Sequence, residues 1–297
     1  MELPDGIKAV GEQLAAGGEV AAPPELFEAY DVFSAELANL LVRPWLAVDR
    51  AARLAEDGDY FRAELGSRSV VFVREAADRI HAMRNACLHA GYRVCEEESG
   101  RGDQLFCQYH GWYYALDGRL TDPLLRPEQK DHSRFRLPRY AMRIERGLIF
   151  VDMSKAAPAP PEGGPLDTAG LPPWLEAADV TGRQRLATTV NWKYLRQFLW
   201  AAPDTVFAAP GLDGFIEYGP TSYVAWQGEQ AALVRLAPRF PGHSDIAVIR
   251  LAPPDSGTQL GADERLAAAL RDAPPAGPLD RGFYEWYWSG LNAPLPV

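Results

Sequence analysis

The chain has 297 residues, of which 47% are hydrophobic, enough to bury one large core or two modest ones. Its net charge of −10 argues against a general nucleic-acid binder, which would carry a basic face. No stretch approaches the roughly 18 apolar residues of a membrane span, and residues 1–24 lack the apolar segment of a secretory signal. We therefore expect a cytoplasmic protein with no membrane and no nucleic-acid partner. Abundant Arg, Ala and Gly suggest a GC-rich bacterial host.

The N-terminal half divides into a helical and an all-β part. Residues 25–48 carry apolar positions at helical spacing, and Pro44 is expected to end that helix. Between about residues 60 and 152 the pattern changes to short apolar runs rich in β-branched residues, and Asp117-Gly118 marks a hairpin turn. This segment predicts a small all-β domain.

The C-terminal half has a mixed pattern. Residues 156–165 are rich in Pro and Gly and predict a linker. A helical run at residues 190–202 is followed by strands within 214–249 and a helix at 262–272. The order predicts a second domain that combines helices with a sheet.

Cysteine and histidine cluster in the predicted β domain. Three cysteines (Cys87, Cys95 and Cys107) are too few for a disulfide framework, and such clusters in a reducing compartment more often hold metal. Cys87-Leu-His89 is followed, after seventeen residues, by Cys107-Gln-Tyr-His110. Cys95 lies outside this pattern and is interpreted as a small buried hydrophobic residue.

Two kinds of metal site compete for these four residues. A structural zinc site also takes two Cys and two His, but zinc sites usually keep the cysteines together and the histidines together. Here each of two segments contributes one Cys and one His. That order is typical of a [2Fe–2S] cluster in which thiolates hold one iron and imidazoles the other, which raises the reduction potential.

The flanking residues extend the pattern into a resemblance. Gly111-Trp112 follows His110, a Leu-Asp-Gly-x-Leu run spans residues 116–120, and Arg43-Pro-Trp45 and Gly58-Asp-Tyr60 lie upstream. Residues from about 26 to 155 resemble the N-terminal part of Rieske non-haem iron oxygenase α subunits. The resemblance implies that Cys87, His89, Cys107 and His110 bind a Rieske cluster. One departure is Ala90, where the family commonly has Arg.

The same resemblance implies a second metal, a mononuclear Fe(II) held by two His and one carboxylate. In the family the two histidines come from a helix that begins Asn-Trp-Lys, which is matched here by Asn191-Trp192-Lys193. An alignment without gaps places the bridging acid on Ala201 and the two histidines on Asp204 and Ala209. Asp280 matches the acidic ligand position, although an Asp that caps a helix explains it equally well.

A count of histidines agrees with the alignment. The chain has five, and besides His89 and His110 only His81, His132 and His243 remain, none at helical spacing with another. We therefore expect no mononuclear Fe(II) and no catalytic residue in this chain.

The expected fold class is α+β: an N-terminal all-β Rieske domain and a shortened C-terminal domain with helices on an antiparallel sheet. The expected boundaries are 1–43 for an N-terminal extension and helix, 44–155 for the Rieske domain and 166–297 for a degenerate oxygenase-like domain.

Three functions stay open at this point. The first is a non-catalytic α-like subunit that relays electrons from a reductase or ferredoxin to the iron of a related catalytic α subunit, in a trimeric or hexameric assembly. The second is an oxygenase that acts alone with atypical iron ligands. The third is a Rieske electron carrier, against which the large second domain argues. The substrate and the electron donor are not identified by the sequence.

Overall fold

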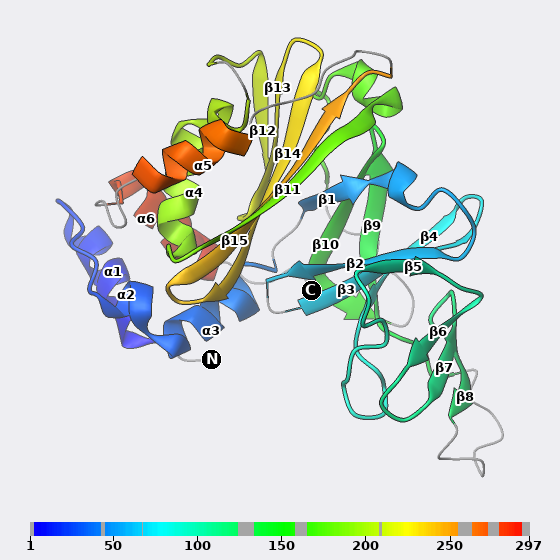
Figure 1. Cartoon of the computed structure of the whole chain (residues 1–297). Helices are drawn as coiled ribbons and strands as arrows, with labels where there is room; N and C mark the ends of the chain where they lie inside the picture. The colour runs from blue at the N-terminus through cyan, green and yellow to red at the C-terminus, as the bar shows by residue number, and fades with distance from the viewer. Residues whose placement is uncertain are drawn as a thin grey trace.

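The computed structural model describes residues 3–42, 45–66, 68–123, 134–157, 165–207, 210–254, 263–272 and 279–292. Three antiparallel sheets organise these residues, and helices cover one side of the molecule (Figure 1). No helix within the described ranges is long and apolar enough to cross a membrane.

The first sheet has seven strands in the order β1-β10-β9-β4-β3-β2-β5. Its strands are β1 (Leu46–Arg50), β2 (Asp59–Leu65), β3 (Arg68–Ala76), β4 (Arg79–Arg84), β5 (Ser99–Arg101), β9 (Arg139–Glu145) and β10 (Leu148–Ala157). Consecutive β-branched and aromatic residues in β3 are buried on both faces, as the run Val70 to Val73 shows. Such continuous burial fits a strand in the interior of a sheet.

A second sheet of three strands projects from the first and lies farthest from the helices (Figure 1). It contains β6 (Gln104–Cys107), β7 (Trp112–Ala115) and β8 (Leu120–Pro123). The predicted Asp117-Gly118 turn joins β7 to β8, and Gly118 adopts a φ of 84°, which only glycine takes without strain. The predicted all-β domain is therefore present as two sheets.

The third sheet has five strands in the order β11-β15-β14-β13-β12. Its strands are β11 (Asp179–Thr188), β12 (Gly214–Tyr218), β13 (Ser222–Gln227), β14 (Gln230–Phe240) and β15 (His243–Ala252). Six helices lie on one side of it (Figure 1): α1 (Asp5–Ala16), α2 (Glu25–Glu28), α3 (Tyr30–Asn39), α4 (Trp192–Ala201), α5 (Asp263–Asp272) and α6 (Arg281–Asn292). The short 3-10 helices are η1 (Ala51–Arg53), η2 (Pro173–Ala177) and η3 (Pro203–Val206). The α+β class predicted from the sequence is confirmed.

The seven-stranded and five-stranded sheets share one hydrophobic core. Phe150 of β10 and Ala47 of β1 pack with Val224 and Leu233 of the third sheet. The backbone N–H of Ala47 also donates to the Ser222 hydroxyl at 3.0 Å. The seven-stranded sheet of the N-terminal half therefore packs directly on the five-stranded sheet of the C-terminal half through buried contacts.

A buried polar cluster fixes the N-terminal helices to the C-terminal half. Glu36 of α3 has no exposed surface and accepts hydrogen bonds from Trp192 Nε1 at 2.8 Å and from Tyr287 Oη at 2.5 Å. Lys193 Nζ lies 2.6 Å from Glu36 and is equally buried. Because both charges are paired and hydrogen-bonded, α3, α4 and α6 are locked in one relative position.

Two predicted elements differ from the structure. The helix expected at residues 25–48 is two helices, because Ala29 is extended (ψ 134°), and residues 46–50 form β1. The start of the expected linker, Ala156 and Ala157, belongs to β10. Pro44 and residues 158–164 lie outside the described residues.

Candidate metal centre

Two loops bring the four predicted cluster ligands together. Cys87 and His89 follow β4, while Cys107 ends β6 and His110 precedes β7. The Nδ1 atoms of His89 and His110 lie 2.8 Å apart, and their ring centroids are 4.3 Å apart. Cys87 and Cys107 are buried and not disulfide-bonded. The two histidines are only half-buried, so the thiols lie deeper than the imidazoles.

Both loops close in the same way. The N–H of Gly91 donates to the Cys87 carbonyl at 2.8 Å, and the N–H of Gly111 donates to the Cys107 carbonyl at 3.0 Å. Both glycines have positive φ values, 76° and 71°, which disfavour any residue with a side chain. A glycine four residues after each cysteine is the sequence signal for these turns; of the two, only Gly111 entered the motif used for the prediction.

Aromatic rings support the two loops. The ring of Trp112 stacks on that of His89 with centroids 5.0 Å apart. Tyr92 and Tyr109, one from each loop, stack with centroids 3.7 Å apart, and both are exposed. The rings hold the imidazoles in place while their outer edge stays accessible.

Tyr114 is a further residue at the centre that the sequence did not reveal. Its hydroxyl lies 3.1 Å from Cys87 Sγ and accepts the N–H of Leu88 at 3.0 Å. Burial, followed by the hydrogen bond to Cys87, raises the pKa of this phenol above its ordinary value. The hydroxyl therefore stays protonated and can donate to a sulfur ligand. The tyrosine pair in residues 113–114 was the available signal.

The donor set fits a Rieske cluster. Such a cluster takes two thiolates on one iron and two imidazole nitrogens on the other. Burial, with a further contribution from Cys87, raises the pKa of the Cys107 thiol, so iron binding there would have to displace a proton. The inward-facing Nδ1 atoms are nitrogens that could bind iron, and this direction places each Nε2 away from the other ring. Cys95 is buried, and burial raises the pKa of its thiol to about 12, which fits its interpretation as an inert core residue.

The positions aligned with the mononuclear iron site lie near the end of α4 and the start of α6. Ala201 is the last residue of α4, and Asp204 lies in η3 and accepts the N–H of Gly211 at 3.0 Å. Asp280 Oδ1 accepts the N–H of Phe283 at 2.7 Å at the start of α6. Ala209 and His132 lie outside the described residues.

Asp280 and Ala201 line one cavity of about 370 Å³. The same cavity is lined by Arg196, whose guanidinium stacks on the Trp286 ring at 3.7 Å and pairs with Glu217 at 2.5 Å. Within the described ranges, no three His, Cys, Asp or Glu side chains are grouped closely enough to bind a single metal ion. His81 lies on β4 and His243 on β15, in different sheets.

Comparison with known proteins identifies one domain of the chain. The family model for the Rieske [2Fe-2S] domain matches residues 44–138. A glycine betaine monooxygenase oxygenase subunit of Chromohalobacter salexigens is 28% identical over 178 residues, which are 59% of this chain and 40% of that protein. A benzene 1,2-dioxygenase subunit alpha of Pseudomonas putida is 31% identical over 142 residues, 45% of this chain and 30% of that protein. The chain thus matches less than half of the length of these relatives.

Solved structures extend the similarity in fold beyond this domain. The naphthalene 1,2-dioxygenase of Rhodococcus sp. superposes with a TM-score of 0.63 over 98% of this chain and 86% of that one, at 16% identity. The quaternary ammonium Rieske monooxygenase CntA superposes with a TM-score of 0.61 over 84% and 80% of the two chains, at 17% identity. The chain therefore contains a Rieske [2Fe–2S] domain and is homologous to the α subunits of Rieske oxygenases.

Proposed function

We propose that this chain is a non-catalytic α-like subunit that relays single electrons to the iron of a related subunit. The observation that carries the proposal is an asymmetry between two sites. Four side chains suited to a Rieske cluster converge at an exposed end of the molecule, whereas the positions aligned with the oxygenase iron carry alanine and two aspartates with other tasks.

Cys87, His89, Cys107 and His110 would hold the cluster, which supplies reversible one-electron transfer. The buried cysteines anchor it in the domain, and the half-buried imidazoles leave its outer edge close to the surface. Leu88 and Tyr109 beside them are exposed, with 38% and 54% of their surfaces accessible. This edge is where a donor or an acceptor chain could approach.

Three features speak against an iron site in the C-terminal half. Ala201 has no carboxylate with which to bridge to a neighbouring histidine. Asp204 and Asp280 both accept backbone N–H groups, which are typical turn and cap interactions. The cavity that Asp280 lines also contains Arg196 and Trp286, neither of which is an iron ligand.

The expected partners follow from this asymmetry. A related catalytic α subunit would carry the iron, a reductase or ferredoxin would supply electrons, and alternating subunits would form a trimer or hexamer. Relatives named as an oxygenase subunit and a subunit alpha support a role within a larger complex. The alternative is an oxygenase that acts alone with atypical iron ligands, for which the oxygenase activity in those names speaks.

We also propose the domain boundaries 1–43, 44–155 and 166–297. The family match at 44–138 and a first sheet that runs from β1 to β10 support the second of these. The five-stranded sheet lies wholly within the third.

The test is to purify the tagged chain from its native host and measure turnover of the resulting complex. We expect a co-purifying related subunit that carries two iron-binding histidines. His110→Ala should abolish turnover while the partner's iron remains bound, and Asp204→Asn should leave turnover unchanged. Iron-dependent product formation by this chain alone, lost in Asp204→Asn, would contradict the proposal.

A further inference from the structure

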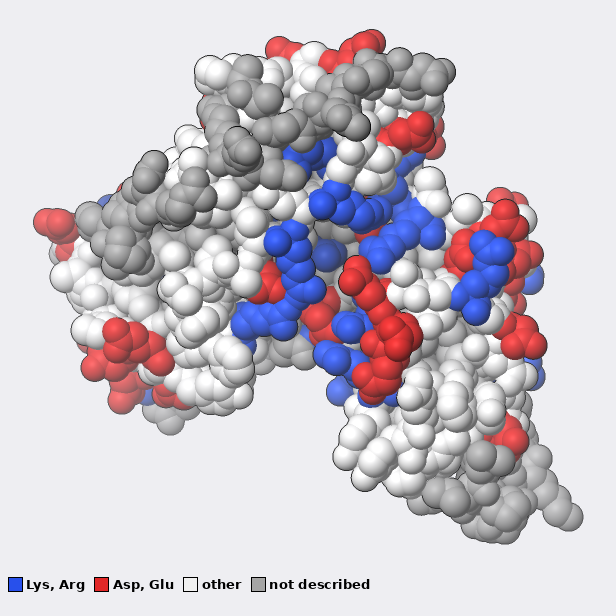
Figure 2. All heavy atoms as spheres, in the orientation of Figure 1, with Lys and Arg blue, Asp and Glu red and all other residues white. Residues whose placement is uncertain are grey.

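A cleft between the first and third sheets is lined largely by arginine, although the chain as a whole is acidic. Its volume is about 250 Å³. Five arginines line it: Arg53, Arg62, Arg183, Arg185 and Arg235. Figure 2 shows Lys and Arg side chains gathered over this junction, with acidic side chains among them.

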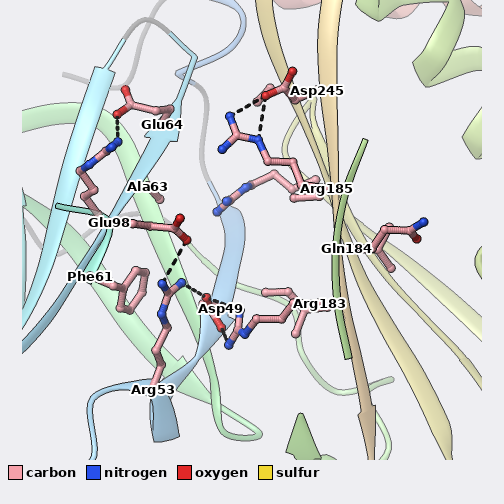
Figure 3. Close-up of a pocket in the computed structure, with 16 residues that line it drawn as sticks. Asp49, Arg53, Phe61, Ala63, Glu64, Glu98, Arg183, Gln184, Arg185 and Asp245 are labelled. Atoms are coloured by element: carbon pink, nitrogen blue, oxygen red, sulfur yellow. Dashed lines mark hydrogen bonds and ion pairs between the residues drawn. The ribbon is translucent and has the colours of Figure 1, made fainter. Parts of the chain in front are cut away.

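Two carboxylates of the cleft, Asp49 and Asp245, each form hydrogen bonds with two arginines. Asp49 accepts two hydrogen bonds from Arg183, at 2.7 and 2.8 Å, and one from Arg53 at 2.8 Å. Asp245 accepts from Arg185 at 2.6 Å and from Arg239 at 2.5 Å. Figure 3 shows Asp49 beside Arg53 and Arg183, and Asp245 beside Arg185.

The remaining two acids of the cleft, Glu64 and Glu98, belong to the Rieske half and are also paired. Glu64 binds Arg62 at 2.7 Å and Arg93 at 3.0 Å, and Glu98 lies 3.3 Å from Arg53. The cations in contact with the four carboxylates therefore outnumber them, even before Arg235 is considered.

Arg235 is the guanidinium that these acids leave uncompensated. It projects from β14, and its Nη1 donates to the Val48 carbonyl at 3.2 Å. Its Nε is buried and has no hydrogen-bond partner. Within the described part of the chain, no carboxylate forms an ion pair with Arg235. Burial, reinforced by the neighbouring arginines and opposed only by Asp49, lowers its pKa to about 10, so it is still charged at neutral pH.

Arg235 is half-buried, one of its N–H groups has no hydrogen-bond partner, and no carboxylate of the described residues pairs with it, so an acceptor in the cleft would compensate its charge. An oxyanion that offers two acceptor oxygens suits the fork of an arginine, whereas a bulky ligand would not fit a cavity of this size. We infer that this cleft binds a small oxyanion, a carboxylate or a phosphate, with Arg235 as its principal donor. The bound anion would join the Rieske half to the five-stranded sheet. This inference is independent of the proposed electron-relay function.

The test is calorimetric titration of the chain with inorganic phosphate and with succinate, at an ionic strength held constant with NaCl. We expect saturable binding of one anion per chain. Binding of phosphate alone or of succinate alone would support the site and identify the group that it prefers. Heats no larger than those of a matched NaCl titration would overturn it.

Two variants locate the site. Arg235→Gln should weaken binding about 10- to 100-fold, the loss expected for one charged hydrogen-bonding group. Arg79→Gln is the matched control, because Arg79 is an exposed arginine of β4 that pairs with Glu75 outside the cleft. Equal weakening in both variants would contradict a specific role for Arg235.

A measurement on the unaltered chain covers the case in which Arg235→Gln does not fold. Crystals of the wild-type chain soaked in selenate should show anomalous density within hydrogen-bond distance of Arg235. Density only at other arginines, or no density in the cleft, would overturn the inference.

Discussion

Asp280 Oδ1 lies 2.7 Å from the backbone nitrogen of Phe283, so this carboxylate caps helix α6. The backbone N–H of Asp280 in turn donates to Gln197 Oε1 at 3.0 Å, which joins the start of α6 to helix α4. The family alignment makes Asp280 a candidate iron ligand, and these hydrogen bonds give it a structural role as a helix cap.

If Asp280 caps helix α6, its variants should differ in their free energy of unfolding. Asp280→Ala should lower the free energy of unfolding by about 1 kcal/mol, because α6 loses its cap. Asp280→Ser should be nearly neutral, since a serine hydroxyl also caps a helix. Urea unfolding measures both values. A loss of bound iron in Asp280→Ser, with stability retained, would instead identify Asp280 as a metal ligand.

The ligand assignment predicts different fates for two buried cysteines. Cys107→Ser should abolish the visible absorption and the rhombic EPR signal of a His-ligated [2Fe–2S] cluster, because one iron loses a thiolate. Cys95→Ser should keep both signals, since the Cys95 thiol lies outside the pattern of ligands. Both spectra are recorded on reduced protein. A signal that survives in Cys107→Ser would show that the ligand assignment is wrong.

The Tyr114 hydroxyl should raise the reduction potential of the cluster. A hydrogen bond to a ligand sulfur stabilises the more negative, reduced state, so Tyr114→Phe should lower the reduction potential by roughly 50 mV. Tyr113→Phe is the matched control, because Tyr113 neighbours Tyr114 in β7 and its ring packs against Phe106 of the adjacent strand β6. Redox titration followed by EPR measures both. Equal reduction potentials in Tyr114→Phe and wild type would contradict a hydrogen bond from Tyr114 to a cluster ligand.

Asp49 should make stability depend on pH. Hydrogen bonds from Arg183 and Arg53 outweigh the largest single effect, burial, and lower the pKa of Asp49 below 3.8. Its contribution is therefore complete above about pH 4 and disappears as the pH falls through the folded-state pKa.

Asp49→Asn should thus cost about 3 kcal/mol at pH 7, because it breaks a buried ion pair. The difference from wild type should be constant between pH 7 and 5 and shrink below pH 4. Asp5→Asn, at an exposed surface pair, should change stability by less than about 0.5 kcal/mol. Urea unfolding across this pH range provides the measurement, and a pH-independent difference would refute the assignment.

Local spacing explains why the cluster residues could be predicted and their surroundings could not. Cys87 and His89 lie two residues apart, as a ligand motif requires, so the sequence alone indicates them. The Arg235 cleft combines residues of β1, β11, β14 and β15 that become neighbours only when two sheets pack together. No sequence period marks such a site.

The break between the N-terminal helices α2 and α3 could not be predicted from the sequence either. The break between α2 and α3 occurs at Ala29, a residue with high helix propensity and no capping role in the sequence pattern. Leu26 of α2 and Val32 of α3, on either side of the break, are buried in the same hydrophobic core. Tertiary contacts here override local preference.

The most direct test of the account is the number of irons per chain. The purified chain, reconstituted with iron and sulfide and incubated with Fe(II) before desalting, is assayed for iron and examined by Mössbauer spectroscopy. We predict two irons per chain, both in a Rieske cluster. A third iron with the signature of a high-spin mononuclear Fe(II) would contradict the account and favour an oxygenase with atypical ligands.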